Sequence, residues 1–512
     1  ALPPPHRRQR PLPCNVGRRG LRAGPVQMLR LNATRRCLRP APSAVAAVLG
    51  RRGLATFPQI DPRTSKVFKE YKEMSQEEVE GSIVGAQAAF QEWRHVPPLD
   101  RIRTMSVAAE RLRASADTAA ELINREMGKP VAQGKAEVLK CAYLVDWYAQ
   151  HGGKILKDKE YPPLPGFRKS FVTYQPLGVI LSIMPWNFPI WQVIRMCVPT
   201  LMAGNAVLLK HAPNCFGSAE LCEDLINGLP GVPKGLFKSL VIDVPQVNHV
   251  LEHKIVQGVA LTGSESAGRA VAAKAGGLLK KAVVELGGCD AYAILADADL
   301  DQAAEAVVSA RVLNSGQVCS APKRAIVDKT VKAAFEQKVL EKLAQKQYGS
   351  DFGPLVHSRA REDVAKQVKE SQEQGAKLLA GGADARVPAG ESGGCFFAPT
   401  VLTDVKPGMT AFDKEIFGPV ISIVEAEDEK HAIELANTSH YGLGGGVFTK
   451  DLAKGESIAV KDLEAGMSFV NDTVRSDPSL PFGGVKASGL GRECAAFGML
   501  EFVNVKTICV KK

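Results

Sequence analysis

The chain has 512 residues, of which 45% are hydrophobic and 23% are charged, which predicts a folded protein of more than one domain and excludes a mainly disordered chain. The formal net charge of +11 would favour nucleic acid as a partner, but residues 1–56 hold twelve arginines and no lysine, aspartate or glutamate, and the rest carries about −1. Because the basic charge lies in residues 1–56, we do not expect nucleic acid as a partner. No run of 18 apolar residues occurs, so we do not expect a membrane as a partner either.

Residues 1–56 are rich in arginine, proline and alanine and contain no acid. This composition is typical of an organellar transit peptide. We expect it to direct the protein to the mitochondrial matrix, with the plastid as the alternative, and Met28 to be the start of the leader. A tail without any targeting role stays open as the plain alternative.

Apolar residues three and four positions apart predict helices over residues 76–93, 100–127 and 135–148. A loop rich in proline and glycine follows at 162–169, and then an alternating strand at 170–174. Continuous apolar runs predict buried strands at 178–184, 206–210, 239–242 and 258–262, with helices at 218–227 and 246–252 between them. Alternation of this kind indicates a parallel sheet with helices on both faces.

A second alternating series begins after Gly288. Strands are predicted at 291–295, 324–327, 420–424 and 446–448, and helices at 303–313, 331–345, 363–375 and 430–437, with a last strand at 507–510. We therefore expect two doubly wound α/β domains joined near residue 288.

Cys319 is one of eleven cysteines, an odd number that includes no C-x-x-C pair. We expect no disulfide framework and no metal site, and most of the thiols should be buried apolar groups. Cys319 differs because Asn314-Ser-Gly-Gln-Val-Cys319 follows a helix predicted to end at Gly316. A turn there can expose the sulfur and offer backbone N–H groups to an oxyanion. An inert cysteine is the alternative.

Three other motifs follow predicted strands. Glu285, in Val284-Glu285-Leu-Gly-Gly288, could serve as a general base, or could be an ordinary strand-end acid. Asn187, in Pro-Trp-Asn-Phe-Pro, could donate to an oxyanion, or could only cap its loop. The glycine-rich turn around Gly263 opens a helix and could bind phosphate, although this pattern alone is weak.

In this order and spacing, the motifs resemble those of the aldehyde dehydrogenase superfamily from residue 57 to the C-terminus. The resemblance implies an aldehyde dehydrogenase-like α/β fold with a Rossmann-like cofactor domain, a catalytic domain and a small oligomerisation element. The implied ranges are a leader at 1–56, an NAD(P)-binding domain at 57–155 and 176–287, a catalytic domain at 288–490, and an oligomerisation element at 156–175 and 491–512. It also implies a homodimer or a homotetramer.

The resemblance assigns a role to each site residue. Cys319 is the nucleophile, Asn187 and the Cys319 N–H hold the oxyanion, and Glu285 activates water for hydrolysis of a thioester. Relatives that pass the acyl group to coenzyme A lack this glutamate. The residues implied for NAD or NADP are Trp186, Lys210, Gly263, Ser264, Gly268, Glu415 and Phe417.

Within the superfamily the chain looks most like bacterial-type succinate-semialdehyde dehydrogenases, and Arg195 would bind the carboxylate of the substrate. Leu313 stands where other branches have a second arginine, and Arg475 could replace it. Pro213 stands where enzymes that prefer NAD often have a glutamate, so we expect both cofactors to be used. Ala321 replaces the second cysteine of a redox switch.

Two alternatives stay open. The enzyme could act on other carboxylated or short aliphatic aldehydes, with Arg195 on a helix surface or at an interface. The chain could also be a catalytically silent binding or structural protein on the same scaffold, because a fold does not by itself imply a function.

Overall fold

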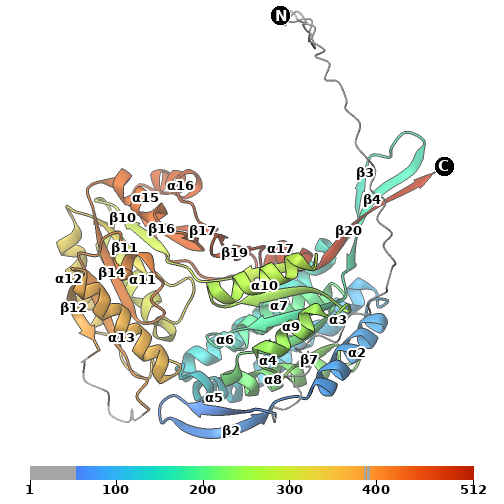
Figure 1. The fold of residues 1–512 in the computed structure, drawn as a ribbon. Helices are drawn as coiled ribbons and strands as arrows, with labels where there is room; N and C mark the ends of the chain where they lie inside the picture. Colours follow the sequence, from blue (N-terminus) through green and yellow to red (C-terminus); the bar gives the residue numbers. More distant parts are fainter. Residues whose placement is uncertain (1–53, 384, 386–387, 389–392, 512) are drawn as a thin grey trace, which may run out of the picture. The chain divides into compact units, whose positions relative to one another are not determined.

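The structure is a computed structural model that describes residues 54–383, 385, 388 and 393–511. The predicted leader lies outside the described residues except for its last three positions. From Leu54 onward the chain folds as one unit, and three sheets of three or more strands organise its described part (Figure 1).

The first sheet has six strands in the order β19-β9-β8-β5-β6-β7 in the described chain. All neighbours are parallel except β19, which pairs antiparallel with β9. The strands are β5 (Val179–Met184), β6 (Ala206–His211), β7 (Phe237–Ser239), β8 (Val256–Thr262), β9 (Lys281–Glu285) and β19 (Gly489–Leu490).

Helices lie on both sides of this sheet (Figure 1). They are α2 (Gln76–Trp93), α3 (Pro98–Ser106), α4 (Ala108–Ala114), α5 (Ala116–Met127), α6 (Val131–Ile155), α7 (Trp191–Met202), α8 (Phe216–Asn227), α9 (Val244–Glu252) and α10 (Glu265–Gly277). Ser75 and Glu78 form a reciprocal capping box that starts α2, and the Ser264 side chain caps α10.

The second sheet has seven strands in the order β12-β13-β14-β11-β10-β16-β17 among the described residues, and only β12 is antiparallel to its neighbour. The strands are β10 (Ala291–Ile294), β11 (Arg324–Asp328), β12 (Lys377–Gly382), β13 (Ala398–Thr403), β14 (Val420–Ala426), β16 (Gly444–Phe448) and β17 (Met467–Val470). The helices are α11 (Leu300–Val312), α12 (Lys332–Leu343), α13 (Ser358–Glu373), α14 (Thr410–Asp413), α15 (Glu429–Asn437) and α16 (Leu452–Lys461).

Side chains of β10 show how the second sheet is buried on both faces. Ala291 and Ala293 belong to one apolar core, whereas Tyr292 and Ile294 belong to another. Since successive side chains of a strand point to opposite faces, each face of the sheet packs against its own layer. This explains why the strand reads as a continuous apolar run.

A third sheet contains β3 (Lys159–Tyr161), β4 (Phe167–Pro176) and β20 (Val503–Lys511), all antiparallel. Short elements complete the described chain: the hairpin β1 (Thr56–Asp61) with β2 (Lys66–Lys72), the pair β15 (Tyr441–Gly442) with β18 (Val485–Lys486), and helix α17 (Ala495–Leu500). In the described chain, no helix has the length and apolarity that crossing a membrane would need.

Several expectations about elements were wrong. The strand predicted at 239–242 is β7, which ends at Ser239, because Asp243 caps α9 and draws the chain out of the sheet. The helix predicted at 100–127 is divided into α3, α4 and α5. The strand β19 lies in the range predicted for the catalytic domain but pairs with β9 of the first sheet. The β1–β2 hairpin and the β12–β13 pair were not predicted.

Candidate active site

The candidate residues of the first sheet lie where parallel strands end. Asn187 follows β5, Gly263 follows β8, and Glu285 is the last residue of β9. The register pairs Thr262 of β8 with Glu285, so these ends lie side by side. The carboxyl edge of a parallel α/β sheet is the usual place for ligands.

The turn before Cys319 has three consecutive residues with left-handed backbone: Asn314, Ser315 and Gly316, with φ of 49°, 56° and 72°. The predicted continuation of the helix to Gly316 is therefore wrong, because α11 ends at Val312. A Cβ at Gly316 would clash with the Gly418 carbonyl. The turn is an unfavourable conformation that the surrounding contacts must maintain.

Hydrogen bonds to neighbouring segments hold this turn. Asn314 N donates to Gln133 Oε1 at 2.9 Å, and Asn314 Nδ2 donates to the Asn187 carbonyl at 2.8 Å. Ser315 Oγ donates to the Gly353 carbonyl at 2.8 Å. These bonds fix Cys319 relative to the Asn187 loop, which comes from the other sheet.

A buried ion pair holds the Asn187 loop in place. Lys129 Nζ pairs with Glu137 and also donates to the Asn187 carbonyl at 2.8 Å. The other Glu137 oxygen accepts from the N–H groups of Ile190 and Trp191, both at 2.9 Å. Neither Lys129 nor Glu137 was identified from the sequence, because each is separated from Asn187 by about 50 residues or more.

Asn187 itself points toward the nucleophile segment. Its Nδ2 donates to the Gln317 carbonyl at 3.0 Å. A carboxamide has two N–H donors, so the second can serve an oxyanion at Cys319.

Glu285 is 3% exposed and lies 3.9 Å from the Arg195 guanidinium (Oε2 to Nη2). Burial raises its pKa to about 7, against the opposing charge of Arg195. Among the described residues, neither of its oxygens accepts a hydrogen bond from a protein N–H or O–H. A carboxylate with this pKa and without a fixed partner is suited to general-base chemistry near neutral pH.

Burial also raises the pKa of the Cys319 thiol well above its usual value, and the nearby Glu285 carboxylate acts in the same direction. The thiol is therefore protonated at rest. To become a nucleophile it has to give its proton to a neighbouring base, and Glu285 is the adjacent candidate.

A cavity of about 300 Å³ brings these groups together. Cys319, Glu285 and Asn187 line it together with the predicted cofactor residues Trp186, Gly263, Ser264, Glu415 and Phe417; the remaining lining residues are Pro185, Thr262, Leu286 and Gly287. The Trp186 and Phe417 rings meet edge to face, 5.7 Å apart. The size suits a small substrate together with one end of a larger ligand.

The first turn of α10 gives the cavity a feature that fits a dinucleotide. Ser264 caps the helix by accepting from Ala267 N, and the dipole of this 13-residue helix favours an anion near Gly263. A Cβ at Gly268 would clash with the Leu286 side chain, so this glycine lets α10 pack closely against the end of β9. Lys210 is buried in β6, where burial lowers its pKa.

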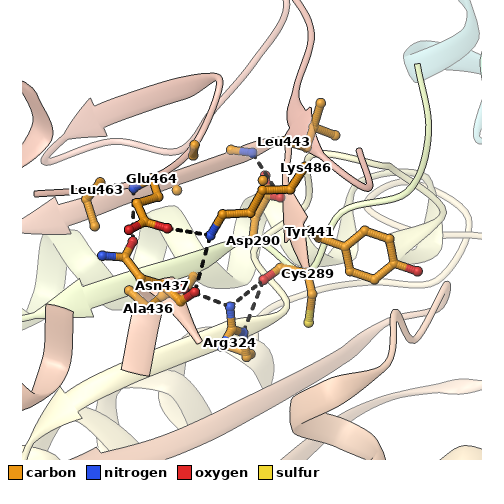
Figure 2. Close-up of a pocket in the computed structure, with 15 residues that line it drawn as sticks. Cys289, Asp290, Arg324, Ala436, Asn437, Tyr441, Leu443, Leu463, Glu464 and Lys486 are labelled. Carbon is orange, nitrogen blue, oxygen red and sulfur yellow. Dashed lines mark hydrogen bonds and ion pairs between the residues drawn. The ribbon is translucent and has the colours of Figure 1, made fainter. Parts of the chain in front are cut away.

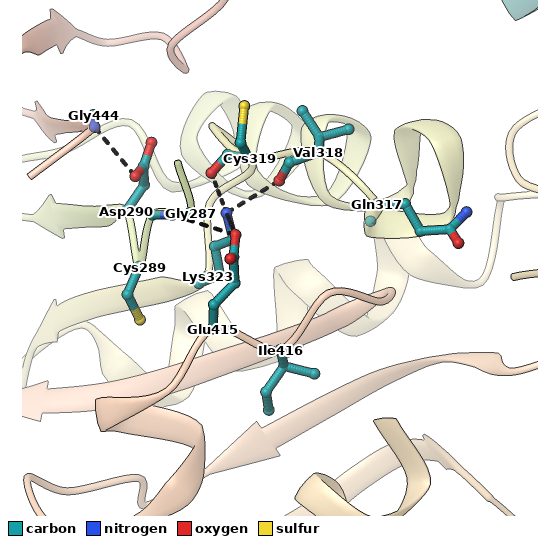
Figure 3. A network of polar contacts seen from close by, with 12 residues as sticks. Gly287, Cys289, Asp290, Gln317, Val318, Cys319, Lys323, Glu415, Ile416 and Gly444 are labelled. Atoms are coloured by element: carbon teal, nitrogen blue, oxygen red, sulfur yellow. Dashed lines mark hydrogen bonds and ion pairs between the residues drawn. The ribbon is translucent and has the colours of Figure 1, made fainter. Parts of the chain in front are cut away.

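Glu415 lies against the Gly287–Gly288 turn that follows Glu285 (Figure 3). Gly288 N donates to Glu415 Oε1 at 3.3 Å, and a Cβ at Gly287 would clash with the same carboxylate. Gly287 is thus required by the close approach of Glu415, and Gly288 by the close approach of Asp290 and Leu443.

Behind this turn, Arg324 fixes the start of the second sheet (Figure 2). It donates to the Cys289 carbonyl and to the carbonyls of Leu435, Ala436 and Thr438 at the end of α15. Asp290 accepts from Gly444 N at 3.2 Å. These contacts are structural, and they hold the segment between Glu285 and β10 in place.

The two predicted substrate arginines have different environments. Arg195 on α7 is 2% exposed and is ion-paired with Glu493, which sequence reasoning missed. Arg475 is exposed and pairs with Asp472 at 2.5 Å. Neither arginine is among the residues that line the cavity. The structure therefore brings Arg195 next to Glu285, which lines the cavity, whereas the ion pair of Arg475 is with Asp472.

In the described segments, no group of three potential metal-ligating side chains comes together.

Known proteins resemble this chain over most of its length. A sequence model described as the Aldehyde dehydrogenase family matches residues 50–508. The succinate semialdehyde dehydrogenase [NAD(P)+] Sad of Escherichia coli (strain K12) is 41% identical over 455 residues, which are 88% of this chain and 96% of that protein. A succinate-semialdehyde dehydrogenase [NADP(+)] of Mycolicibacterium paratuberculosis is 40% identical over 459 residues, again 88% of this chain and 96% of that protein.

Among solved structures, the succinic semialdehyde dehydrogenase of Streptococcus pyogenes in complex with NADP+ superposes with a TM-score of 0.85. Its sequence is 34% identical, and the match covers 89% of this chain and all of that one.

Proposed function

Since this chain belongs to the aldehyde dehydrogenase family, we propose that it oxidises succinate semialdehyde, or a similar carboxylated aldehyde, to the acid with NAD+ or NADP+. The observation that carries the proposal is the meeting of Cys319, Glu285 and Asn187 in one cavity, next to the buried cation Arg195. Relatives with 40–41% identity that are named for this substrate support the choice of aldehyde.

The proposed reaction begins at the thiol. Glu285 accepts the Cys319 proton, the sulfur attacks the aldehyde carbon, and a thiohemiacetal forms whose oxygen is held by Asn187 Nδ2 and the Cys319 N–H. When bound, the nicotinamide would take a hydride from that carbon. The product is a thioester on Cys319. Glu285 first releases the proton of the thiol to solvent and then removes a proton from water, whose oxygen attacks the thioester carbon. The C–S bond breaks, the acid leaves, and the Cys319 thiolate takes a proton back from Glu285.

The residues expected for NAD or NADP fit such a ligand. The N-terminus of α10 can face a pyrophosphate, Glu415 can accept from ribose hydroxyls, and Lys210 is the penultimate residue of β6. Pro213 provides no carboxylate to repel a 2′-phosphate, which supports the use of both cofactors.

Two cations lie close to the indole of Trp191, and their charge favours binding of an anionic substrate. Arg195 Cζ lies 6.0 Å from the ring centre, and Lys140 Nζ lies 4.3 Å from it. Lys140 donates to Ser476 Oγ at 2.7 Å and, in the described part of the chain, forms no ion pair with an acid. Arg195 Nε is buried without a hydrogen-bond acceptor from the described residues. We propose Arg195 with Lys140, rather than Arg475, as the site for the substrate carboxylate.

The test compares KM for succinate semialdehyde and for propanal, with NAD+ and NADP+, in wild type, Arg195→Leu and Lys140→Met. Loss of one cation should raise KM for the carboxylated aldehyde about tenfold or more and change KM for propanal little. Lys135→Met is the matched control, because Lys135 is on the same helix but pairs with Asp117 at the surface. Equal effects on both aldehydes would favour a broad-specificity enzyme.

We also propose that the protein is a homodimer or homotetramer, and that residues 1–56 direct it to the mitochondrial matrix. The arginine-rich, acid-free composition of that segment supports the second proposal. Import of a fusion of residues 1–56 with a fluorescent protein into mitochondria tests it, and a fusion that stays in the cytosol would contradict it.

A further inference from the structure

A buried lysine contacts the backbone of the nucleophile, and the proposed reaction does not use it. Lys323 is four residues after Cys319, and its side chain is 2% exposed. Its Nζ donates to the carbonyl of Cys319 and, at 3.0 Å, to the carbonyl of Val318 (Figure 3). The ammonium therefore fixes the peptide groups on both sides of the nucleophile's α-carbon.

The same ammonium forms an ion pair with Glu415, 3.0 Å from Nζ to Oε1. Gly288 N donates to this oxygen as well. Glu415 is thus oriented by one bond from the nucleophile segment and one bond from the turn that follows Glu285. Lys323 and Glu415 together join the segments that carry the nucleophile, the general base and the carboxylate proposed to face the ribose, because Lys323 contacts the first and Glu415 accepts from the turn after Glu285 (Figure 3).

The charge of Lys323 also acts on the thiol. The other ionisable groups that face Cys319 are Glu285 on β9, which disfavours the thiolate, and Arg195 on α7, which favours it. Lys323 favours the thiolate more than Arg195 does, in opposition to burial. Asp290, whose backbone carbonyl accepts the Lys323 N–H, is buried too, and burial raises its pKa to about 6 against the charge of Lys323.

We propose that Lys323 is a positioning residue that couples the carboxylate of Glu415 to the geometry and ionisation of Cys319. One ammonium contacts Glu415 and the carbonyls of Val318 and Cys319. A ribose diol that engages Glu415 therefore acts on a group already bonded to the nucleophile's carbonyl. The inference rests on the proposed function, because it takes Cys319 as the nucleophile and Glu415 as a ribose ligand. The experiment that tests the inference requires neither an aldehyde nor turnover.

The experiment uses Lys323→Met, which keeps the length of the side chain and removes the charge. The rate of alkylation of Cys319 by iodoacetamide is measured against pH, with the modified peptide identified by mass spectrometry, since other cysteines are present. The dissociation constant for NADPH is measured by fluorescence on the same samples. Lys346→Met is the matched control, because Lys346 is also partly buried and pairs with Glu305 at 3.1 Å, away from the site.

For Lys323→Met we expect alkylation at pH 7.5 to slow about tenfold, its pH midpoint to rise by about one unit, and NADPH to bind about tenfold more weakly. Lys323→Arg should recover part of both properties, because it restores a cation. The control should change neither. A folded Lys323→Met with unchanged alkylation and NADPH binding, even if less heat-stable, would overturn the proposal.

Glu415→Gln provides a second route if Lys323→Met does not fold. It keeps the shape of Glu415 and removes the partner of Lys323, so it should change both NADPH binding and the pH profile of alkylation. A change in NADPH binding alone would show that Glu415 and Cys319 are not coupled, and would reject the inference while leaving the proposed substrate untouched.

Discussion

At the residue scale, Glu285 shows how burial creates a base for neutral pH. A solvated glutamate would be ionised far below pH 7 and would be a weak base. In the cavity, burial raises its pKa to about 7, although Arg195 opposes that rise. Arg195 is shared with Glu493, so its charge is only partly available to Glu285. The arrangement leaves Glu285 able to take a proton and release it again.

We therefore predict that the steady-state rate falls as the pH drops below about 7. The protonated form of Glu285 cannot accept a proton, so kcat should decrease about tenfold per pH unit below that value.

Stopped-flow absorbance at 340 nm separates formation of the reduced cofactor in the first turnover from steady turnover. Glu285→Gln should lower steady turnover at least 100-fold, because the neutral amide is not a base.

Glu493→Gln is a useful comparison, since it alters the ion pair of Arg195 without removing Glu285. It should leave more of the Arg195 charge to Glu285 and move the pH midpoint of kcat downward. A wild-type profile that is flat between pH 5.5 and 8, or undiminished turnover in Glu285→Gln, would remove Glu285 from the proposed role.

At the element scale, the close approach of α10 to the end of β9 depends on Gly268. This glycine faces the Leu286 side chain, and a Cβ there would clash with it. Gly276, in the same helix, has no atom within 4 Å of the position that a Cβ would take. The two glycines form a natural pair for comparing the effects of helix propensity and packing.

We predict opposite signs for the two alanine variants. Gly276→Ala should stabilise the protein by about 0.5–1 kcal/mol, because alanine has the higher helix propensity. Gly268→Ala should destabilise it by about 1–3 kcal/mol and weaken NADPH binding, because α10 or Leu286 has to move. Denaturant unfolding and fluorescence titration measure these effects. Equal effects on stability would show that close packing of α10 is unimportant.

At the scale of the whole molecule, the three-stranded sheet offers edges for assembly. β20 pairs with β4 over most of its length, which leaves its other side as an edge, and β3 is the opposite edge. Val505 on β20 is 59% exposed although it is apolar. Exposed apolar strands at a sheet edge favour pairing with another chain, which supports the proposed homo-oligomer.

Val505→Asp should lower the mass measured by size-exclusion chromatography with light scattering, because a carboxylate would be buried at the interface. Lys506→Gln is the control, since successive side chains of the strand point to opposite faces. An unchanged mass for Val505→Asp would indicate that assembly, if it occurs, uses another surface.

Much of the fold could be predicted because strands such as β5 and β6 are buried on both faces and are therefore continuous apolar runs. The hairpin of β1 and β2 was missed because its side chains are mostly exposed and carry no comparable pattern. The turn at Asn314 was missed for another reason: its left-handed backbone is maintained by contacts with Gln133 and Asn187, far away in the sequence.

The sequence by itself indicated the reactive groups, because the motifs that contain Cys319, Glu285 and Asn187 occur together in the order and spacing of the aldehyde dehydrogenase family. Tertiary structure decided their partners. No local motif marks the charged residues that hold the site together, which are Lys129, Glu137, Lys140 and Lys323. They acquire their roles because the fold places them beside distant segments. A charge removed from water must find a partner, and the identity of that partner depends on which segments the folded chain brings together.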